Sequence, residues 1–380
     1  MGRPFTRRAL LAAVGSAAIA GCVGGGPSSE TAREDPSEPT AAKHGSPTGT
    51  DGRRSGGGPP TAKQRLPLPL APSAIRDRAV SGGPPKDGIP SIDDPVFEPV
   101  DEVDNRLAPG DPVFGVSSGN AAKAYPQSIL VWHEICNDTI GDRPVSVTYC
   151  PLTGTAMGFE RGETTFGVSG RLVNNNLIMY DRATETWWPQ VLATAVPGPW
   201  NEDPRIESLS EFRVVWTTWR RWKAAYPDTR VLTRETGFAR NYDRDPYGSY
   251  NPRGGYYAPD AAPMFRSLSQ DDRLPPKAVV IGTRNPNGAA AFRKQHLRRA
   301  KLVDGELGNT PVVAVYDAAL DTGYVYRNPD EVPLEYRDGT VRTGDGEAHQ
   351  PGDVPLERVL AFDAMWFAWS GFYPDTSLHA

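Results

Sequence analysis

Short alternating runs of apolar and polar residues dominate the chain between residues 113 and 180. Ser128 to Ile135 alternates, which is typical of a strand with one buried face. Residues 138–142 break the pattern, and Pro144 to Cys150 resumes it in β-branched residues, so the sequence predicts an antiparallel hairpin. Further strands are expected at residues 155–159, 165–168 and 177–180.

Aromatic residues at helical spacing mark two other segments. The spacing i, i+3 and i+7 occurs in two triplets: Trp219, Trp222 and Tyr226, and Trp366, Trp369 and Tyr373. Residues at this spacing share one face of a helix, and the proline after each tyrosine ends it. We expect helices at 211–225 and 356–372, packed as lids on the sheets with the aromatic residues as core anchors.

The sequence also repeats itself. Without a gap, residues 113–160 align with 280–327 at a shift of 167, and 11 of these 48 pairs are identical. The pattern W-x-x-W-x-x-x-Y-P-D-T at 219–229 returns at 366–376, a shift of 147. Self-similarity of this kind indicates a duplicated structural unit.

Together these patterns predict an α+β, strand-rich chain of two tandem pseudo-repeats of antiparallel sheet, each closed by an aromatic helix. Repeat lobe 1 is expected at 74–236 and repeat lobe 2 at 279–380. Between them, residues 237–278 are expected to form a connector rich in Tyr, Pro and Gly. Its aromatic rings either pack against both lobes and hold them together or line a cleft. The connector tyrosines are Tyr242, Tyr247, Tyr250, Tyr256 and Tyr257.

The first 22 residues have the order of an export signal. Arg7 and Arg8 precede a short apolar run, Leu10 to Ala20, that is roughly half the ~20 residues needed to span a bilayer. Paired arginines favour export of a folded protein. Ile19 to Cys22 resembles a lipobox, so we expect a lipoprotein held by Cys22 at the outer face of the cytoplasmic membrane, on the cell surface; a plain signal peptide with an incidental cysteine is the alternative.

Composition limits the structures and functions that are possible for the rest of the chain. Residues 23–73 are rich in Gly, Pro and Ser with almost no large apolar residue before Leu66, which predicts a disordered tether. The net charge is −5, so the chain lacks the excess of basic residues that is typical of a nucleic-acid-binding protein, and nucleic acid is not an expected partner. HExxH and P-loop motifs are absent from the sequence, which disfavours the metalloproteases and nucleotide enzymes that those motifs define.

Reactive residues are concentrated in the first repeat. It carries His133, Glu134, Cys136, Asn137, Asp138, Cys150 and Thr153. The matching positions of the second repeat hold Ala300, Lys301, Val303, Asp304, Gly305, Asp317 and Leu320. Lobe 1 is therefore the candidate functional lobe, with ordinary sequence drift as the alternative.

Hairpin geometry suggests which reactive residues meet. If the turn is centred at 140–142, Cys150 faces a position between 130 and 134, which includes His133. Such a pair is an activated nucleophile, two ligands of a soft metal such as copper or zinc, or a buried structural cysteine near a hydrogen-bonded histidine. Cys136 lies outside this window, although a disulfide between Cys136 and Cys150 stays open for an exported protein.

Several strings resemble a known family. They are Trp132 to Asp138, Tyr149 to Ala156, Phe166 to Gly170, Tyr180 to Thr184 and Phe372 to Thr376. Over about residues 88–378 they resemble the domain-of-unknown-function family numbered 3179, whose C-P-L-x-G-[ST]-A signature stands at Cys150 to Ala156. The resemblance implies export or membrane association and no assigned activity. Many members carry C-P-L-C-G, whereas this chain has Thr153 in place of the second cysteine, so no CxxC redox or zinc role carries over.

Three functional hypotheses follow. The first is a lipid-anchored protein that binds a small ligand or soft metal through His133 and Cys150. The second is an extracytoplasmic enzyme with Cys150 as nucleophile, His133 as base, Glu134 beside them and Asn137 or Asn175 as polar support. The third is a noncatalytic interaction module that uses the connector as its contact surface. Residues expected at a ligand are Asp138, Thr153, Asn175, Tyr180, Asp181 and Arg182, with turns and surface ion pairs as their alternative role.

Overall fold

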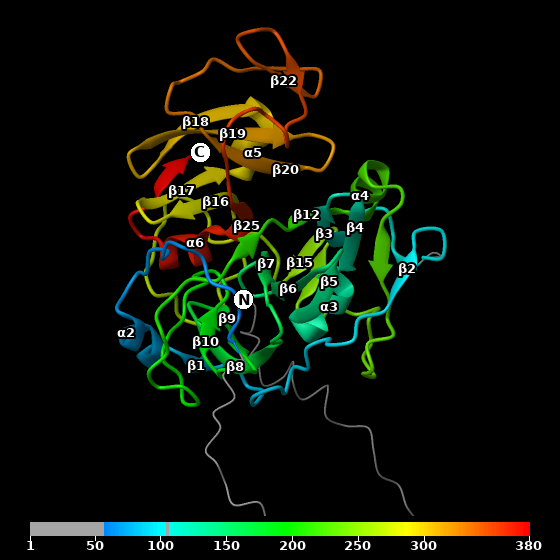
Figure 1. Ribbon diagram of the computed structural model, residues 1–380, viewed down its shortest axis with the longest axis vertical. Coiled ribbons are helices and arrows are strands. Elements are labelled where there is room, and N and C mark those ends of the chain that lie inside the picture. Colours follow the sequence, from blue (N-terminus) through cyan, green and yellow to red (C-terminus); the bar gives the residue numbers. More distant parts are fainter. Residues whose placement is uncertain (1–56, 104–105) are drawn as a thin grey trace, which may run out of the picture. The chain divides into compact units, whose positions relative to one another are not determined.

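The computed structural model describes residues 57–103 and 106–380. Strands far outnumber helices, and nearly all strand pairs are antiparallel (Figure 1). The strand-rich class with several antiparallel sheets is thereby confirmed. In the described part of the chain, no helix has the length and apolar character needed to cross a membrane. The expected signal and most of the expected tether lie outside the described residues.

Three sheets, here called the N-terminal sheets, lie within residues 80–232. The first contains, in spatial order, β12 (Val215–Thr218), β3 (Pro112–Ser118), β4 (Ala121–Pro126), β13 (Arg230–Leu232) and β2 (Phe97–Pro99). The second contains β11 (Glu211–Phe212), β7 (Thr155–Glu160), β6 (Arg143–Cys150) and β5 (Ile135–Ile140). The third contains β1 (Val80–Ser81), β8 (Phe166–Val173), β9 (Asn176–Asp181) and β10 (Trp187–Pro189). The helices of this region are α2 (Pro72–Asp77), α3 (Gln127–His133) and α4 (Trp219–Ala225).

The C-terminal sheets lie within residues 279–379. One contains β25 (Ala361–Met365), β16 (Val279–Asn285), β17 (Gly288–Arg293) and β26 (Ser377–His379). Another contains β18 (Leu302–Leu307), β19 (Thr310–Asp317), β20 (Thr322–Arg327) and β24 (Arg358–Val359), and a third β21 (Glu335–Arg337), β22 (Thr340–Arg342) and β23 (Ala348–His349). The helices are α5 (Lys294–Ala300) and α6 (Trp366–Phe372), and the connector forms the hairpin of β14 (Gly248–Tyr250) and β15 (Arg253–Gly255).

The predicted strand from Ser128 to Ile135 is wrong. Residues Gln127–His133 form helix α3, which ends where Glu134 adopts a left-handed φ of 59° and donates its N–H to the carbonyl of Leu130. Most of the helix is buried, including neighbours such as Ile129, Leu130 and Val131, so its apolar residues are not confined to one face. Periodicity alone does not separate a short buried helix from a strand.

The two aromatic helices are shorter than predicted. They begin at Trp219 and Trp366, because the residues before them pair as strands. β12 joins the edge of β3, and β25 joins β16, each in antiparallel register. The residues of β12 are all β-branched or aromatic, which favours a strand over a helix, whereas β25 is fixed by its pairing with β16.

The tether boundary predicted at residue 73 is also wrong. Thr61 forms a β-bridge with Leu209, and the N–H of Ala62 donates to the carbonyl of Ser208 at 2.7 Å. The N–H of Leu66 donates to the Ser208 hydroxyl at 2.8 Å. Residues 57–73 therefore belong to the folded part of the chain.

Buried charge joins the N-terminal to the C-terminal sheets. Arg284 on β16 pairs with Glu211 on β11 at 2.7 Å, and the arginine side chain has no exposed surface. Arg213 donates to the carbonyls of Ala361 and Gly323 at 2.6 and 2.8 Å. Removing one partner of such a pair leaves an uncompensated buried charge, so these contacts fix the spacing of the elements they connect.

Candidate functional site

His133 ends helix α3 and is fully buried. Its Nδ1 lies 2.8 Å from the carbonyl of Pro90, and its Nε2 lies 2.7 Å from the hydroxyl of Tyr242. Because a carbonyl only accepts, Nδ1 carries the proton and Nε2 accepts from Tyr242. Burial, opposed by the Pro90 contact and reinforced by Arg240, lowers the pKa of His133 to about 4. The imidazole is therefore neutral, with both nitrogens engaged.

Cys150 ends strand β6 and is equally buried. Its Sγ donates to the carbonyl of Asn175 at 3.6 Å and accepts the N–H of Leu177 at 3.4 Å. Burial, with Glu134 nearby, raises the pKa of the Cys150 thiol. A buried neutral thiol is a poor nucleophile, which disfavours the thiolate mechanism.

The structure does not bring His133 and Cys150 together. The β5–β6 register, with Ile135 opposite Thr148, would place residue 133 opposite Cys150 if β5 continued. Instead α3 and the left-handed Glu134 redirect the chain, and the two side chains bond to different partners. Cys136 and Cys150 are both free and buried, so they form no disulfide.

Metal binding gains no support from this geometry. Within residues 57–103 and 106–380, no group of three or more His, Cys, Asp or Glu side chains is arranged to hold a metal ion. The copper or zinc site expected at His133 and Cys150 would have at most two ligands, from separate environments.

Asp138 and Asn137 on β5 have structural partners. The Asp138 carboxylate accepts two bonds from Lys123 at 2.8 Å and one from Tyr125 at 2.6 Å. The Asn137 amide donates to Asp93 and accepts from Ser146, both at 2.6 Å. These strong local bonds hold the edge strand β5 in place.

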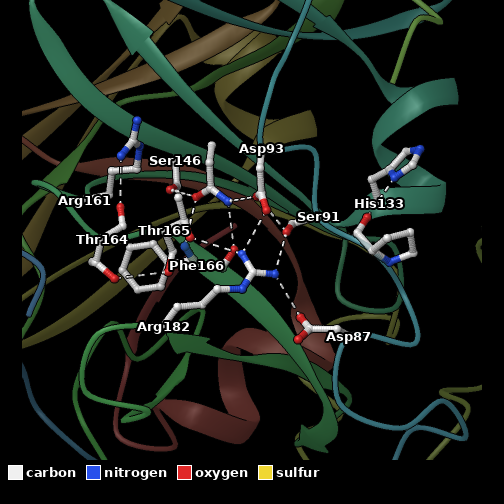
Figure 2. Close-up of polar contacts among 12 residues, drawn as sticks. Asp87, Ser91, Asp93, His133, Ser146, Arg161, Thr164, Thr165, Phe166 and Arg182 are labelled. Carbon is white, nitrogen blue, oxygen red and sulfur yellow. Dashed lines mark hydrogen bonds and ion pairs between the residues drawn. The ribbon is translucent and has the colours of Figure 1, made fainter. Parts of the chain in front are cut away.

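Arg182 gathers several predicted residues into one polar group, here called the Arg182 cluster (Figure 2). Its guanidinium donates to Asp93 at 3.0 Å and to Asp87 at 3.1 Å. Tyr180 donates to the second oxygen of Asp87, and burial together with this bond raises the pKa of Tyr180. Asn137 joins the cluster through Asp93. The three acid and base groups are about a third exposed and satisfy one another, as in a surface ion-pair network.

The remaining predicted residues belong to turns and a buried network. Asp181 accepts from the N–H and hydroxyl of Thr184, both at 2.6 Å. Asn175 forms a two-way amide pair with the backbone of Phe265. Thr153 shares a hydrogen bond with Thr155, and the latter donates to Gln190 at 2.6 Å. None of these groups faces an open space, so their contacts serve the fold.

An open space lies beside the family-like signature instead. A cavity of about 660 Å³ is lined by residues of the N-terminal sheets, the connector and the C-terminal sheets. Gly154 of the signature forms part of its wall, with a left-handed φ of 60° that a glycine tolerates best. The signature loop also anchors the surrounding wall: Leu152 accepts from the Tyr256 hydroxyl at 2.8 Å, and Thr153 accepts the N–H of Met365 at 2.9 Å.

The cavity wall is predominantly cationic. Its charged side chains are Arg253, Lys277, Arg293, Lys294 and Arg298 against Asp321 and Asp363. Lys294 pairs with Asp363 at 2.6 Å, and Arg298 pairs with Asp321 at 2.8 Å. Trp216 and Tyr250 contribute aromatic rings to the same wall, in edge-on contact with centroids 5.2 Å apart.

The sequence reasoning missed all five of these cationic residues. They come from three separate segments, and no motif joins them. The tyrosines of the connector did indicate this region in the sequence. Tyr250 lines the cavity, and the ring of Tyr257 stacks on the ring of Tyr250 with centroids 3.9 Å apart. Because Tyr242 and Tyr257 are buried, the connector offers fewer exposed rings as a contact surface than an interaction module would need.

Comparison with known protein families identifies the family of the chain. Residues 86–376 match the family described as Protein of unknown function (DUF3179). The chain belongs to this family. The match covers most of the sequence and includes the cavity wall from Gly110 to Met365. No curated protein and no solved structure matches the chain.

The buried His133 should make the stability of the protein depend on pH. The unfolded chain takes up a proton near pH 6.5, whereas folded His133 does so only near pH 4. Stability is therefore full above pH 6.5 and falls as the pH drops from 6.5 to 4, by up to about 3 kcal/mol. Asparagine does not titrate, so we expect the free energy of unfolding of His133→Asn to fall less than that of wild type between pH 6.5 and 4. The difference, measured by urea unfolding, should be about 3 kcal/mol. His296→Asn controls for loss of a histidine, and parallel curves for wild type and His133→Asn would contradict the assignment.

Proposed function

We propose that this protein binds a small ligand in the cavity beside Gly154 and does so outside the cytoplasmic membrane. The observation that carries this proposal is the cavity itself, whose volume of about 660 Å³ lies within the usual range for small-molecule sites, roughly 300–1,000 Å³. Its wall combines aromatic rings with charged side chains, both of which can orient a ligand.

The cavity replaces the His133 and Cys150 pair as the ligand site. Both nitrogens of His133 are occupied by Pro90 and Tyr242, and the Cys150 thiol is held by backbone groups. A ligand at His133 and Cys150 would have to displace these partners, whereas a ligand in the cavity would not. The signature then acts indirectly, because its loop holds Met365 of the cavity wall and holds Tyr256, which contacts Lys277 of that wall.

Cavity filling tests ligand binding. Gln295 is an exposed residue of α5 on the cavity wall, so Gln295→Trp should block the space without unfolding the protein. We expect small molecules detected on wild-type protein by ligand-observed NMR with a fragment library to bind at least about tenfold more weakly to this variant. Gln350→Trp, at an exposed position outside the cavity, is the matched control. A wild-type protein that binds no fragment, or binding that Gln295→Trp leaves unchanged, would overturn the proposal.

Cys22 is proposed to hold the protein to the membrane by a lipid after cleavage of residues 1–21. The support is the order of paired arginines, short apolar run and lipobox-like Ile19 to Cys22. In cells, wild-type protein should fractionate with membranes and incorporate labelled fatty acid. Cys22→Ala should do neither, whereas Ser29→Ala should behave as wild type. Membrane retention of Cys22→Ala with no fatty acid on the wild type would refute the anchor.

The N-terminal and C-terminal sheets are proposed to descend from one duplicated unit, each closed by an aromatic helix. Support comes from element bounds: β3, β4, α3, β5, β6 and β7 each lie 167 residues before β16, β17, α5, β18, β19 and β20. The closing helices α4 and α6 lie 147 residues apart, and each is followed by a parallel strand, β13 on β4 and β26 on β17.

The closing contacts also correspond. Trp222 packs on Gly115 and donates to Thr229 at 2.9 Å. Trp369 packs on Gly282 and donates to Thr376 at 3.0 Å. In each case the glycine contact joins the helix to an interior strand of its sheet, β3 or β16.

Glycine substitutions test this correspondence. A Cβ at Gly115 or Gly282 would overlap the facing tryptophan ring, so alanine at either site should lower the free energy of unfolding by about 1–3 kcal/mol. Gly254→Ala, where a Cβ meets no atom within 4 Å, is the control for urea unfolding. A substantial loss at one of the two sites and none at the other would argue against equivalent closures.

A further inference from the structure

Three cations of the cavity wall have no carboxylate partner among the described residues. Lys294 and Arg298 are neutralised by Asp363 and Asp321, the two acids of the wall. Arg253, Lys277 and Arg293 line the same space and form no ion pair within the described ranges. The cavity therefore holds an excess of positive charge in a protein whose net charge is −5.

Arg253 on β15 shows this excess most directly. Its Nε is buried and has no hydrogen-bond partner in the described structure. One terminal nitrogen reaches the carbonyl of Lys277 at 3.5 Å, the limit of a hydrogen bond. Arg253 thus lines the cavity with one long hydrogen bond to a backbone carbonyl and no carboxylate partner among the described residues, so its charge is available to an anion in that space.

Lys277 reinforces the same region. Its side chain is buried, with Nζ donating to the Tyr256 carbonyl at 2.7 Å and lying over the Tyr256 ring. Burial and the nearby Arg253 lower the pKa of Lys277 to about 7. A negative charge beside these two groups would stabilise both cations.

Two other largely buried cations do have carboxylate partners. Arg284 pairs with Glu211, and Lys123 pairs with Asp138. The three unpaired cations of the cavity wall differ from these pairs. Its aromatic rings, Trp216 and Tyr250, offer apolar faces close to the charged groups.

We propose that the cavity ligand is an organic oxyanion, a carboxylate or phosphate on a flat apolar group, held by Arg253 and Arg293. This inference rests on the proposed ligand-binding function and names its chemical class. Arginine suits the role because its planar donors match two oxygens of a carboxylate or phosphate. The flat group would lie against Trp216 and Tyr250.

Calorimetric titration of the full-length, detergent-solubilised protein tests the class. The probes are phenyl phosphate, benzoate, inorganic phosphate and the neutral benzyl alcohol. We expect at least one of the two aromatic anions to bind, and to bind at least about tenfold more tightly than benzyl alcohol, since hydrogen bonds between two charged groups are stronger than those to a neutral hydroxyl. Higher salt should weaken that binding.

Arginine variants locate the contact. Arg253→Met and Arg293→Met should each weaken binding of the aromatic anion about tenfold or more, whereas Arg337→Met, exposed on β21, should not. Arg293 is only partly buried, so its variant keeps the test valid if Arg253→Met fails to fold.

The outcomes separate the two proposals. Benzyl alcohol that binds as tightly as the anions, and is excluded by Gln295→Trp, would overturn the oxyanion inference and leave ligand binding intact. Anion binding that neither arginine variant changes would also overturn it. Absence of binding by every probe and by the fragment library would remove ligand binding altogether.

Discussion

Positive charge enclosed without matching carboxylates is the constraint on which this account depends. Taking a guanidinium or ammonium group out of water is costly unless hydrogen bonds or an opposite charge compensate. Lys277 receives a backbone carbonyl and an aromatic ring, and Arg253 keeps a buried donor unused. A fold that retains such groups at a cavity wall is less stable than one that pairs them. An anionic ligand offers a physical reason to retain them.

The surrounding fold serves to keep this wall in place. The signature loop contacts the connector through Leu152 and Tyr256, and it contacts β25 through Thr153 and Met365. The buried Arg284–Glu211 pair ties β16 to β11. Cys150, which looked chemically active in the sequence, is a packed thiol bonded to the backbone of the neighbouring sheet. Leu152 and Thr153 of the signature thus hold elements that surround the cavity, and Cys150 is packed in the core.

Sequence patterns predicted the fold better than the site. Strands β6 to β9 follow from alternation and β-branched residues, because local periodicity reports one buried face. Helix α3 escaped prediction since it is buried on several sides. That one error also created the His133 and Cys150 pair, because the register of a continued strand would have placed them opposite each other. Arg253, Lys277 and Arg293 meet only through tertiary folding, and single cations in separate segments carry no local signal.

The protonation of Lys277 reports most directly on the enclosed charge. Its pKa can be followed by NMR of ¹³C-labelled lysine side chains, with Lys277→Met to assign the resonance. The account predicts a pKa of about 7 in the free protein and a rise when phenyl phosphate binds, since a nearby anion favours the ammonium form. A Lys277 that titrates near the ordinary lysine value of about 10.4, unaffected by phenyl phosphate, would contradict it.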